Sequence, residues 1–357
     1  GYRVSVYESG GELGGLLRTG IPEFRLPEDI VDKEIDRILA LGVNVVTNHR
    51  IDRQALFNLA RDYDGVLVAT GLQEQVGLRL GLDGTAAVVQ GIEFLDHVYR
   101  DEVRVDGEDV IVIGGGNTAM DAARSALRLG AASVRVVYRR TRDEMPAISE
   151  EIDEALEEGV DIEFLTQPIA LQDEPSDGIR RHYRLRCVRM ELGEPDESGR
   201  RSPVEIKDSE FELDCHRVVL ALGQSPDISV FPEGTEVREG TQLLGLLEKP
   251  VFAIGDLATN EGTVAAAIGS GRRCAVHIHN VLSGEQLNIT EHADALRDVA
   301  GALRGLARLQ SVAEPAAQLA AARAYQQAGK IGRARQSVRR AKSHAKKLGI
   351  VPVEKAA

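Results

Sequence analysis

The chain has 357 residues, 43% of them hydrophobic and 28% charged, and a formal net charge of −13. This length predicts about two domains, each able to bury its own core. The acidic balance argues against nucleic acid as the main ligand, and no apolar run approaches the roughly 18 residues of a membrane span. The three cysteines are too far apart for a C-x-x-C dithiol or for a four-thiolate iron–sulfur cluster built from this sequence alone. We therefore expect buried free thiols in a cytoplasmic protein: Cys187, Cys215 and Cys274.

The first predicted element is an alternating strand over residues 2–8 that ends in an acid, Glu8. Such an acid is typical of the second strand of a Rossmann domain, where it accepts hydrogen bonds from an adenosine ribose. The first strand of such a domain and its glycine loop would precede residue 2, and the sequence does not contain them. In a 3-2-1-4 sheet the first strand lies centrally, so without it two strands would have unpaired edges. We therefore expect the natural protein to begin further upstream.

Two further segments fit the same nucleotide site. Gly14-Gly15 follows Glu8 closely, where a backbone must pass near a bulky ligand, and residues 66–71 form an apolar strand that ends in Ala-Thr-Gly. Each pattern alone is also typical of an ordinary turn or strand exit. Their order along the chain favours a flavin site.

The most specific motif lies in residues 110–121, where a short apolar run is followed by three glycines and the start of a helix. Its spacing is G-x-G-x-x-A, over Gly114, Gly116 and Ala119. The glycines allow a tight turn and close approach of a pyrophosphate, and the helix offers its unpaired N–H groups to that anion. The pattern is weak alone, because a plain strand-to-helix turn also produces it. The next strand strengthens the nucleotide interpretation.

That second strand, over residues 134–138, ends in Arg139 and Arg140. A binder that selects the plain ribose would carry Asp or Glu here, which would repel a 2′-phosphate. Guanidinium groups instead pair with such a phosphate through charge-assisted hydrogen bonds. The sequence thus favours NADP(H) over NAD(H). The alternative is that both arginines are merely solvated at a strand end.

Residues 251–256 predict one more strand, which ends in Gly255-Asp256 and leads through Thr263 into a helix of small residues over 264–268. An aspartate at this strand end can accept hydrogen bonds from a ribityl chain. The start of the helix can stabilise negative charge on a reduced flavin ring.

From residue 290 onward the sequence predicts helices rich in Ala, Arg and Gln. Residues 311–357 hold ten Lys and Arg against two Asp and Glu, a net charge of +8, which leaves −21 for the rest. Residues 320–345 resemble one tetratricopeptide unit, which cannot bury its own face alone. The tail is either a solvated basic extension packed on its own body or a docking element for an acidic partner.

Four longer runs resemble signatures of the small subunit of NADPH-dependent glutamate synthase and related FAD/NAD(P)-dependent enzymes of the pyridine nucleotide-disulfide oxidoreductase superfamily. They cover residues 14–27, 114–121, 138–147 and 190–196, and the resemblance extends to about residue 284. It implies an α/β fold with two Rossmann-like, three-layer dinucleotide-binding domains, the NADPH domain inserted in the FAD domain, and a C-terminal helical extension. The expected FAD domain covers 1–100 and 245–289, the NADPH domain 101–244 and the tail 290–357.

The resemblance also implies the cofactor-binding residues. Those expected at FAD are Glu8, Gly14, Gly15, Leu16, Arg18, Thr70, Gly71, Gly255, Asp256 and Thr263. Those expected at NADPH are Gly114, Gly115, Gly116, Asn117, Thr118, Ala119, Arg139, Arg140 and Gly223. The loop over 21–27 is expected near the isoalloxazine, and residues 221–224 resemble the strand that leaves the inserted domain.

Hydride transfer from nicotinamide to flavin needs proximity and stacking rather than a protein acid, base or nucleophile, so we expect no catalytic residue. The histidines and carboxylates lack the spacing of a metal site or a catalytic triad. The predicted function is that of an NADPH-oxidising flavoprotein subunit that passes electrons to a partner, an iron–sulfur or large catalytic subunit. The alternative is a scaffold subunit of the same fold that has lost its flavin.

Overall fold

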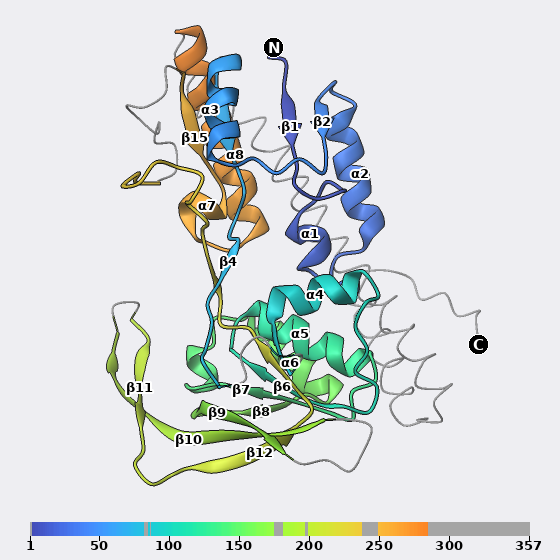
Figure 1. The fold of residues 1–357 in the computed structure, drawn as a ribbon, viewed down its shortest axis with the longest axis vertical. Coiled ribbons are helices and arrows are strands. Elements are labelled where there is room, and N and C mark those ends of the chain that lie inside the picture. The colour runs from blue at the N-terminus through green and yellow to red at the C-terminus, as the bar shows by residue number, and fades with distance from the viewer. Residues whose placement is uncertain are drawn as a thin grey trace, which may run out of the picture. The chain divides into compact units, whose positions relative to one another are not determined.

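A computed structural model describes residues 2–81, 85, 87–174, 181–196, 199–237 and 249–284. The basic tail predicted over 290–357 lies outside these residues. The described residues form two compact units (Figure 1). Unit 1 comprises residues 2–14 and 23–71 together with the described residues from 227 onward, and unit 2 comprises 15–22 and 72–226.

Unit 2 is built on a parallel sheet of five strands in the order β5-β13-β6-β7-β8. These strands are β5 (Val88–Gln90), β13 (Arg217–Leu220), β6 (Asp109–Ile113), β7 (Ser133–Val137) and β8 (Asp161–Glu163). Its helices are α4 (Gly91–Tyr99), α5 (Asn117–Arg128) and α6 (Ser149–Glu158). The order β8-β7-β6-β13 follows the 3-2-1-4 pattern of a Rossmann domain, with β6 as its first strand.

The helices cover one face of this sheet. Val110, Val112 and Val136 point into a core shared with α5, whose alanines at 119, 122, 123 and 126 are fully buried. Small side chains along this helix face allow its backbone to approach the sheet closely. The apolar run that predicts β6 is therefore buried on both sides, as parallel sheets require.

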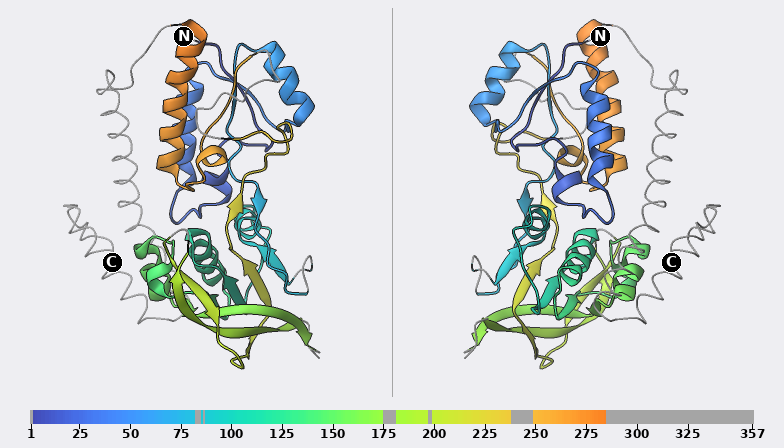
Figure 2. Two further views of the ribbon diagram at one scale, coloured as in Figure 1. Left: turned by 90° about the vertical axis from the view of Figure 1, so that its left-hand side faces the viewer. Right: turned by 90° about the vertical axis from the view of Figure 1, so that its right-hand side faces the viewer.

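An antiparallel sheet covers the other face, which gives unit 2 three layers (Figure 2). Within it, Tyr183, Leu185 and Cys187 point inward against Ile111 and Ile113, while the alternate residues of the same strand point outward. Its strands are β9 (Thr166–Glu174), β10 (His182–Pro195), β11 (Arg201–Glu205) and β12 (Phe211–Cys215). Two short elements, β4 (Glu74–Gln75) and β14 (Gln224–Ser225), pair antiparallel elsewhere in the unit.

A buried ion cluster joins α5 to α6. The guanidinium of Arg124 pairs with Glu151, with Glu154 at 2.7 Å and with Glu158 at 2.8 Å. Burial alone would lower the pKa of Arg124, but the surrounding carboxylates outweigh it and hold that pKa above its ordinary value. Arg128 adds a more exposed bond to Glu158 at 2.6 Å.

Unit 1 contains two separate parallel pairs of strands. They are β1 (Ser5–Tyr7) with β2 (Asn44–Val46), and β3 (Val66–Val68) with β15 (Val251–Ala253). Among the described residues, β1 pairs only with β2, and β3 pairs only with β15. Its helices are α2 (Glu28–Leu39), α3 (Arg53–Asp62), α7 (Asp256–Thr259) and α8 (Val264–Ser283).

The expected α/β class is confirmed, with three differences in detail. Residues 221–224 do not form the strand that leaves the inserted domain: β13 ends at Leu220, and Gly223 has a φ of 105°, which no strand residue adopts. Helix α8 continues well past the predicted 264–268, to Ser283. Residues 88–90, which the sequence analysis assigned to the FAD domain, pair with β13 in unit 2.

No helix among the described residues combines the length and the apolar character that crossing a bilayer would require.

Candidate nucleotide-binding sites

The glycine loop follows β6 directly, and its first two glycines are needed for packing. A side chain on Gly114 would place its Cβ 2.1 Å from the carbonyl oxygen of Ala221, and the φ of Gly114 is 146°. A Cβ on Gly115 would lie 2.5 Å from the ring of Tyr138. Both positions therefore exclude any larger residue for reasons internal to the fold.

Gly116 differs, because no protein atom restricts it. It is the N-cap of α5 with a φ of −93°, and a Cβ there would meet nothing closer than Pro146 at 4.0 Å. The N–H groups of Asn117 and Thr118 point out of the start of α5, whereas that of Ala119 already donates to the carbonyl of Gly116 at 3.0 Å. This open space in front of a helix N-terminus fits a pyrophosphate group, which a side chain at Gly116 would displace.

The other residues expected at NADPH lie around this loop. Ala119 is fully buried and brings α5 against the sheet, and the methyl group of Thr118 lies close to Gly91 at the start of α4. The Asn117 side chain accepts a hydrogen bond from the backbone of Ile148 at 2.9 Å. Asn117 is thus the first residue of α5, and its side chain also holds the neighbouring loop that ends at Ile148.

That loop, over residues 141–148, is held by contacts that the sequence analysis did not assign. The hydroxyl of Tyr138 donates to the carbonyl of Glu144 at 2.7 Å, and the N–H of Ala147 donates to the carbonyl of Gly115 at 3.1 Å. Thr141 and Glu144 cap the short helix η1 (Arg142–Glu144) reciprocally. The T-x-x-E spacing of a capping box is the sequence signal that could have found this turn.

The two arginines after β7 lie in opposite environments. Arg139 is exposed, whereas Arg140 is only 5% exposed. The Nη2 of Arg140 pairs with Asp196 at 2.6 Å, and its Nε donates to the carbonyl of Arg201 at 2.7 Å. The sequence predicts the same role for both residues, but in the structure only Arg139 is exposed.

In unit 1, Glu8 follows β1 at its carboxyl end. One oxygen of its carboxylate accepts a hydrogen bond from the N–H of Gly10 at 2.7 Å and another from the Ser9 hydroxyl at 3.2 Å. These contacts hold the carboxylate at the turn, where an acid can accept bonds from ribose hydroxyls. Gly14, further along the same segment, has a φ of 127°.

The carboxyl ends of β3 and β15 lie side by side, because Val68 pairs in register with Ala253. Thr70 and Gly71 follow β3, and Gly255 and Asp256 follow β15. An oxygen of Asp256 accepts from the N–H of Gly262 at 3.0 Å, and the N–H of Gly255 donates to the buried Ser270 hydroxyl at 2.9 Å.

The start of α8 is capped by Thr263, whose hydroxyl accepts from the N–H of Ala266 at 3.2 Å. The other residues expected at FAD are on α1 (Leu16–Thr19) in unit 2, which begins after Gly15 and includes Leu16 and Arg18. The structure therefore divides the expected FAD residues between two units.

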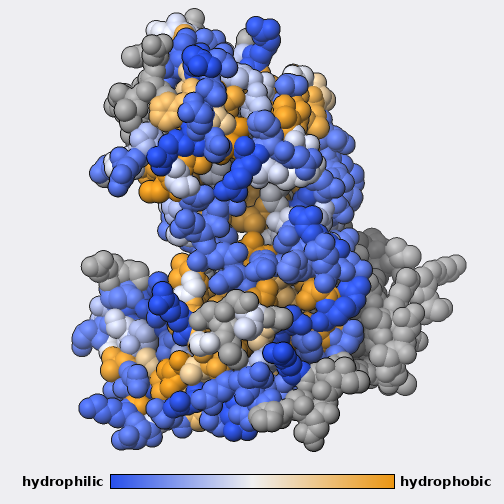
Figure 3. Space-filling view, in the orientation of Figure 1, coloured by the Kyte–Doolittle hydropathy of each residue, from blue (hydrophilic) through white to orange (hydrophobic). Residues whose placement is uncertain are grey.

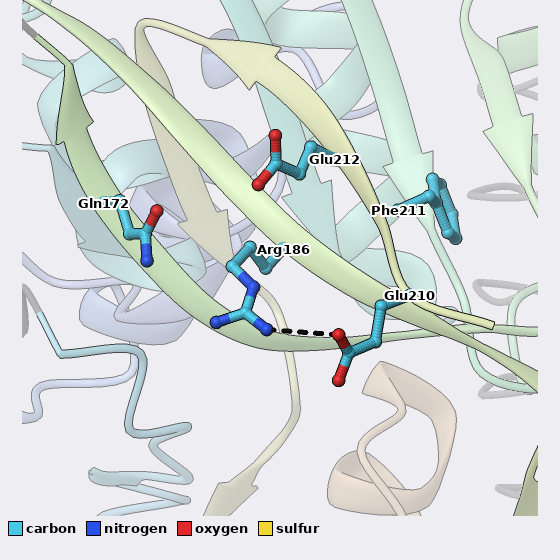
Figure 4. A pocket seen from close by; sticks show the side chains of 5 residues that line it. All are labelled: Gln172, Arg186, Glu210, Phe211 and Glu212. Carbon is cyan, nitrogen blue, oxygen red and sulfur yellow. Dashed lines mark hydrogen bonds and ion pairs between the residues drawn. The ribbon is translucent and has the colours of Figure 1, made fainter. Parts of the chain in front are cut away.

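Other surfaces offer less chemistry. Among the described residues, no group of three or more His, Cys, Asp or Glu side chains could hold a metal ion, and all three cysteines are buried and free. A shallow hollow of about 550 Å³ lies on the outward face of the antiparallel sheet, where Arg186 pairs with Glu210 at 3.3 Å (Figure 4). Its other carboxylate, Glu212, pairs with Arg184 at 3.3 Å, so the hollow does not compete with the glycine loop as the main site.

Comparison with known proteins agrees with this geometry. The family profile of the pyridine nucleotide-disulphide oxidoreductases matches residues 27–271. The chain belongs to this family. Membership confirms the expected enzyme class, an oxidoreductase that uses a pyridine nucleotide, and agrees with the expected FAD and NADPH cofactors.

Two relatives show how far the sequence similarity extends. The NADP(+)-dependent formate dehydrogenase subunit beta of Moorella thermoacetica is 42% identical over 292 residues, which are 79% of this chain and 41% of that protein. The glutamate synthase [NADPH] small chain of Azospirillum brasilense is 35% identical over 302 residues, 78% of this chain and 61% of that protein. The chain thus spans only part of these relatives. The resemblance to glutamate synthase small subunits and their relatives is confirmed.

Among solved structures, Mycobacterium tuberculosis FprA in complex with NADPH has a TM-score of 0.62. Its sequence is 18% identical, and the match covers 83% of this chain and 82% of that one. At this level of identity the likeness supports the fold.

Proposed function

We propose that this chain is the NADPH-oxidising flavoprotein part of an oxidoreductase. In this proposal it binds NADPH in unit 2, binds FAD through the strand ends of unit 1, and transfers a hydride from one to the other. Electrons then pass to a partner, an iron–sulfur or large catalytic subunit.

The contrast between the first and last glycines of the loop carries the NADPH part of this proposal. Gly114 is a glycine because the fold leaves no room for a side chain, whereas Gly116 borders open space at the N-terminus of α5. Nothing in the packing of unit 2 explains why residue 116 lacks a side chain. A phosphate group that approaches the backbone there would explain it.

The FAD part rests on residues at strand ends. Glu8 would hold the adenosine ribose, Asp256 the ribityl chain, and the N-terminus of α8 would stabilise negative charge on the reduced ring. When bound, FAD supplies the ring that accepts the hydride. The protein residues bind and orient, and we assign no catalytic residue.

Two observations support an external electron acceptor. The Moorella relative is named as a subunit of a larger enzyme. Within the described part of this chain, no metal site and no thiol pair is available to take electrons onward. The free, buried cysteines also support our placement of the protein in the cytoplasm. The docking role of the tail stays a prediction from sequence.

The test is anaerobic reduction of the FAD-loaded protein, followed by flavin absorbance. We expect NADPH to bleach the flavin at lower concentration than NADH. Gly116→Ala should raise the NADPH concentration needed by more than about tenfold, because its Cβ occupies the phosphate space.

Gly77→Ala is the matched control, since a Cβ at that glycine also meets nothing within 4 Å and the residue is not part of the glycine loop. It should behave like the unchanged protein. If neither nucleotide bleaches the flavin, the enzyme proposal fails and the scaffold alternative gains support. If Gly116→Ala and Gly77→Ala behave alike, the assignment of the loop to NADPH is wrong.

A further inference from the structure

The environment of Arg140 does not suit a residue that binds a soluble anion. Its side chain is 95% buried, and the groups that bury it are already bonded to it. Nη2 pairs with the Asp196 carboxylate at 2.6 Å, and Nε donates to the Arg201 carbonyl at 2.7 Å. To bind a phosphate through Nε or Nη2, Arg140 would have to give up these hydrogen bonds, one of which is an ion pair.

Both carboxylate oxygens of Asp196 also have hydrogen-bond partners. One of its carboxylate oxygens binds Arg140, and the other accepts the N–H of Arg200 at 3.2 Å. Its own N–H donates to the carbonyl of Arg200 at 2.7 Å. Asp196 thus closes the turn between β10 and β11 and at the same time fastens that turn to the residue after Arg139.

Arg139 lies beside this anchor and is exposed. It follows β7, next to the glycine loop after β6, because Ile113 pairs with Val137 in register. The carboxyl ends of parallel strands meet at one edge of a sheet, so Arg139 lies on the edge where a bound nucleotide would place its ribose. Of the two arginines, it alone has a free path to solvent.

We propose that Arg139 is the residue that binds the 2′-phosphate, and that Arg140 is a positioning residue. The pair of the buried Arg140 with the partly exposed Asp196 fixes the backbone after β7, so that the β10–β11 hairpin takes part in NADPH selectivity without touching the nucleotide. This inference rests on the proposed function, because it concerns how the same NADPH site reads the 2′-phosphate.

The two possible roles of Arg140 predict different effects on phosphate affinity when Asp196 is replaced by asparagine. If Arg140 were a phosphate ligand, the carboxylate of Asp196 would compete with the phosphate for it. Asp196→Asn would then strengthen binding of the phosphate or leave it unchanged. If Arg140 positions Arg139, the same substitution loosens the anchor and weakens binding. Asparagine still accepts the N–H of Arg200, so the turn itself is preserved.

The experiment measures calorimetric binding of 2′,5′-ADP and of 5′-AMP to the FAD-loaded protein. The difference between these probes isolates the 2′-phosphate. We expect Arg139→Gln to abolish most of the preference for 2′,5′-ADP, by about tenfold or more. Asp196→Asn should weaken 2′,5′-ADP binding several-fold and leave 5′-AMP binding unchanged. Glu194→Gln is the matched control, since it removes one exposed negative charge from the same hairpin and should change neither affinity.

A second measurement needs no substitution. Phenylglyoxal modifies accessible arginines, and peptide mapping can separate the two positions. Arg139 should react and be protected by 2′,5′-ADP, while Arg140 should stay unreactive with and without it. The inference is overturned if Arg140 reacts and is protected, or if Asp196→Asn binds 2′,5′-ADP as tightly as the unchanged protein or more tightly. A protein that shows no preference for 2′,5′-ADP over 5′-AMP would instead contradict the proposed NADPH function itself.

Discussion

The two units bury their strands to very different extents. In unit 2 the residues of β6 from Val110 to Ile113 are at most 3% exposed, between a helical layer and a second sheet. In unit 1, β15 is buried, but Val6 of β1 is 37% exposed and Leu67 of β3 is 41% exposed. Figure 3 shows hydrophobic side chains at the surface among hydrophilic ones.

This difference matters for the two sites, because each is made of turns at the carboxyl ends of strands. The glycine loop after β6 is held by a continuous core, and its conformation is set before any ligand binds. The turns after β1 and β3 follow strands that pair on one side only among the described residues. Because the strand that carries the glycine loop is more deeply buried than β1 and β3, we expect unit 2 to be the more stable of the two.

The largest effect should come from the loop that the core holds. Gly114→Ala would drive a Cβ into the Ala221 carbonyl at a φ that non-glycine residues rarely adopt. We expect a loss of more than about 4 kcal/mol in the free energy of unfolding of unit 2. Urea denaturation followed by circular dichroism measures it, with Gly77→Ala as the control. A near-native midpoint for Gly114→Ala would show that the loop is less constrained than its contacts indicate.

Removing the cation between α5 and α6 should come next. Arg124→Ala would remove the buried guanidinium that Glu151, Glu154 and Glu158 share. The expected loss is about 3 kcal/mol, typical of breaking a buried ion pair. Arg128→Ala, which removes a more exposed partner of Glu158, should cost less than about 1 kcal/mol. Equal losses for the two variants in urea would contradict the view that the buried arginine organises this helix pair.

The cysteines can report on the two units separately. Burial raises the pKa of Cys187 and of Cys215 to about 12, so at pH 8 only about one in ten thousand of these thiols is ionised. Because we expect unit 1 to be the less stable unit, labelling with iodoacetamide at increasing urea should modify Cys274 of unit 1 before the two cysteines of unit 2. Mass spectrometry of the peptides reads the order, and simultaneous labelling of all three would mean that the units unfold together.

The same pKa shift has a consequence for pH. The folded state of unit 2 holds the thiol protons more tightly than the unfolded state, so its extra stability is fully present below the ordinary thiol pKa of 9.0. It is lost as the pH rises from there toward about 12. Denaturation midpoints measured at increasing pH should fall over this range.

The smallest expected effect is a gain. Within the described part of the chain, the hydroxyl of Ser125 on α5 is buried and has no hydrogen-bond partner. Ser125→Ala removes a desolvated polar group and favours the helix, so we expect a gain of about 0.5–1 kcal/mol in unfolding free energy. Ser133→Ala, which removes a hydroxyl bonded to Asp109 at 2.5 Å, should instead be slightly destabilising. A clear loss for Ser125→Ala would reveal a contact at that hydroxyl.

Local patterns predicted the strands and turns that build both sites. The apolar runs before Gly114, Arg139 and Gly255 end in the strands expected of them, because a buried parallel strand needs a continuous apolar run and its exit needs a turn. The strand expected over 221–224 was misplaced by a few residues. Its apolar run continues past the last paired residue, and Gly223 turns the chain away.

The sequence by itself determined the family and the G-x-G-x-x-A loop, since these depend on residues close together in the chain, and it predicts that the loop binds a phosphate. The tertiary structure alone decided which of two adjacent arginines is free. Arg140 is buried and paired with Asp196, which lies 56 residues away in the turn after β10, and no local pattern can place that carboxylate. Only the folding of the hairpin onto the end of β7 brings the two charges together.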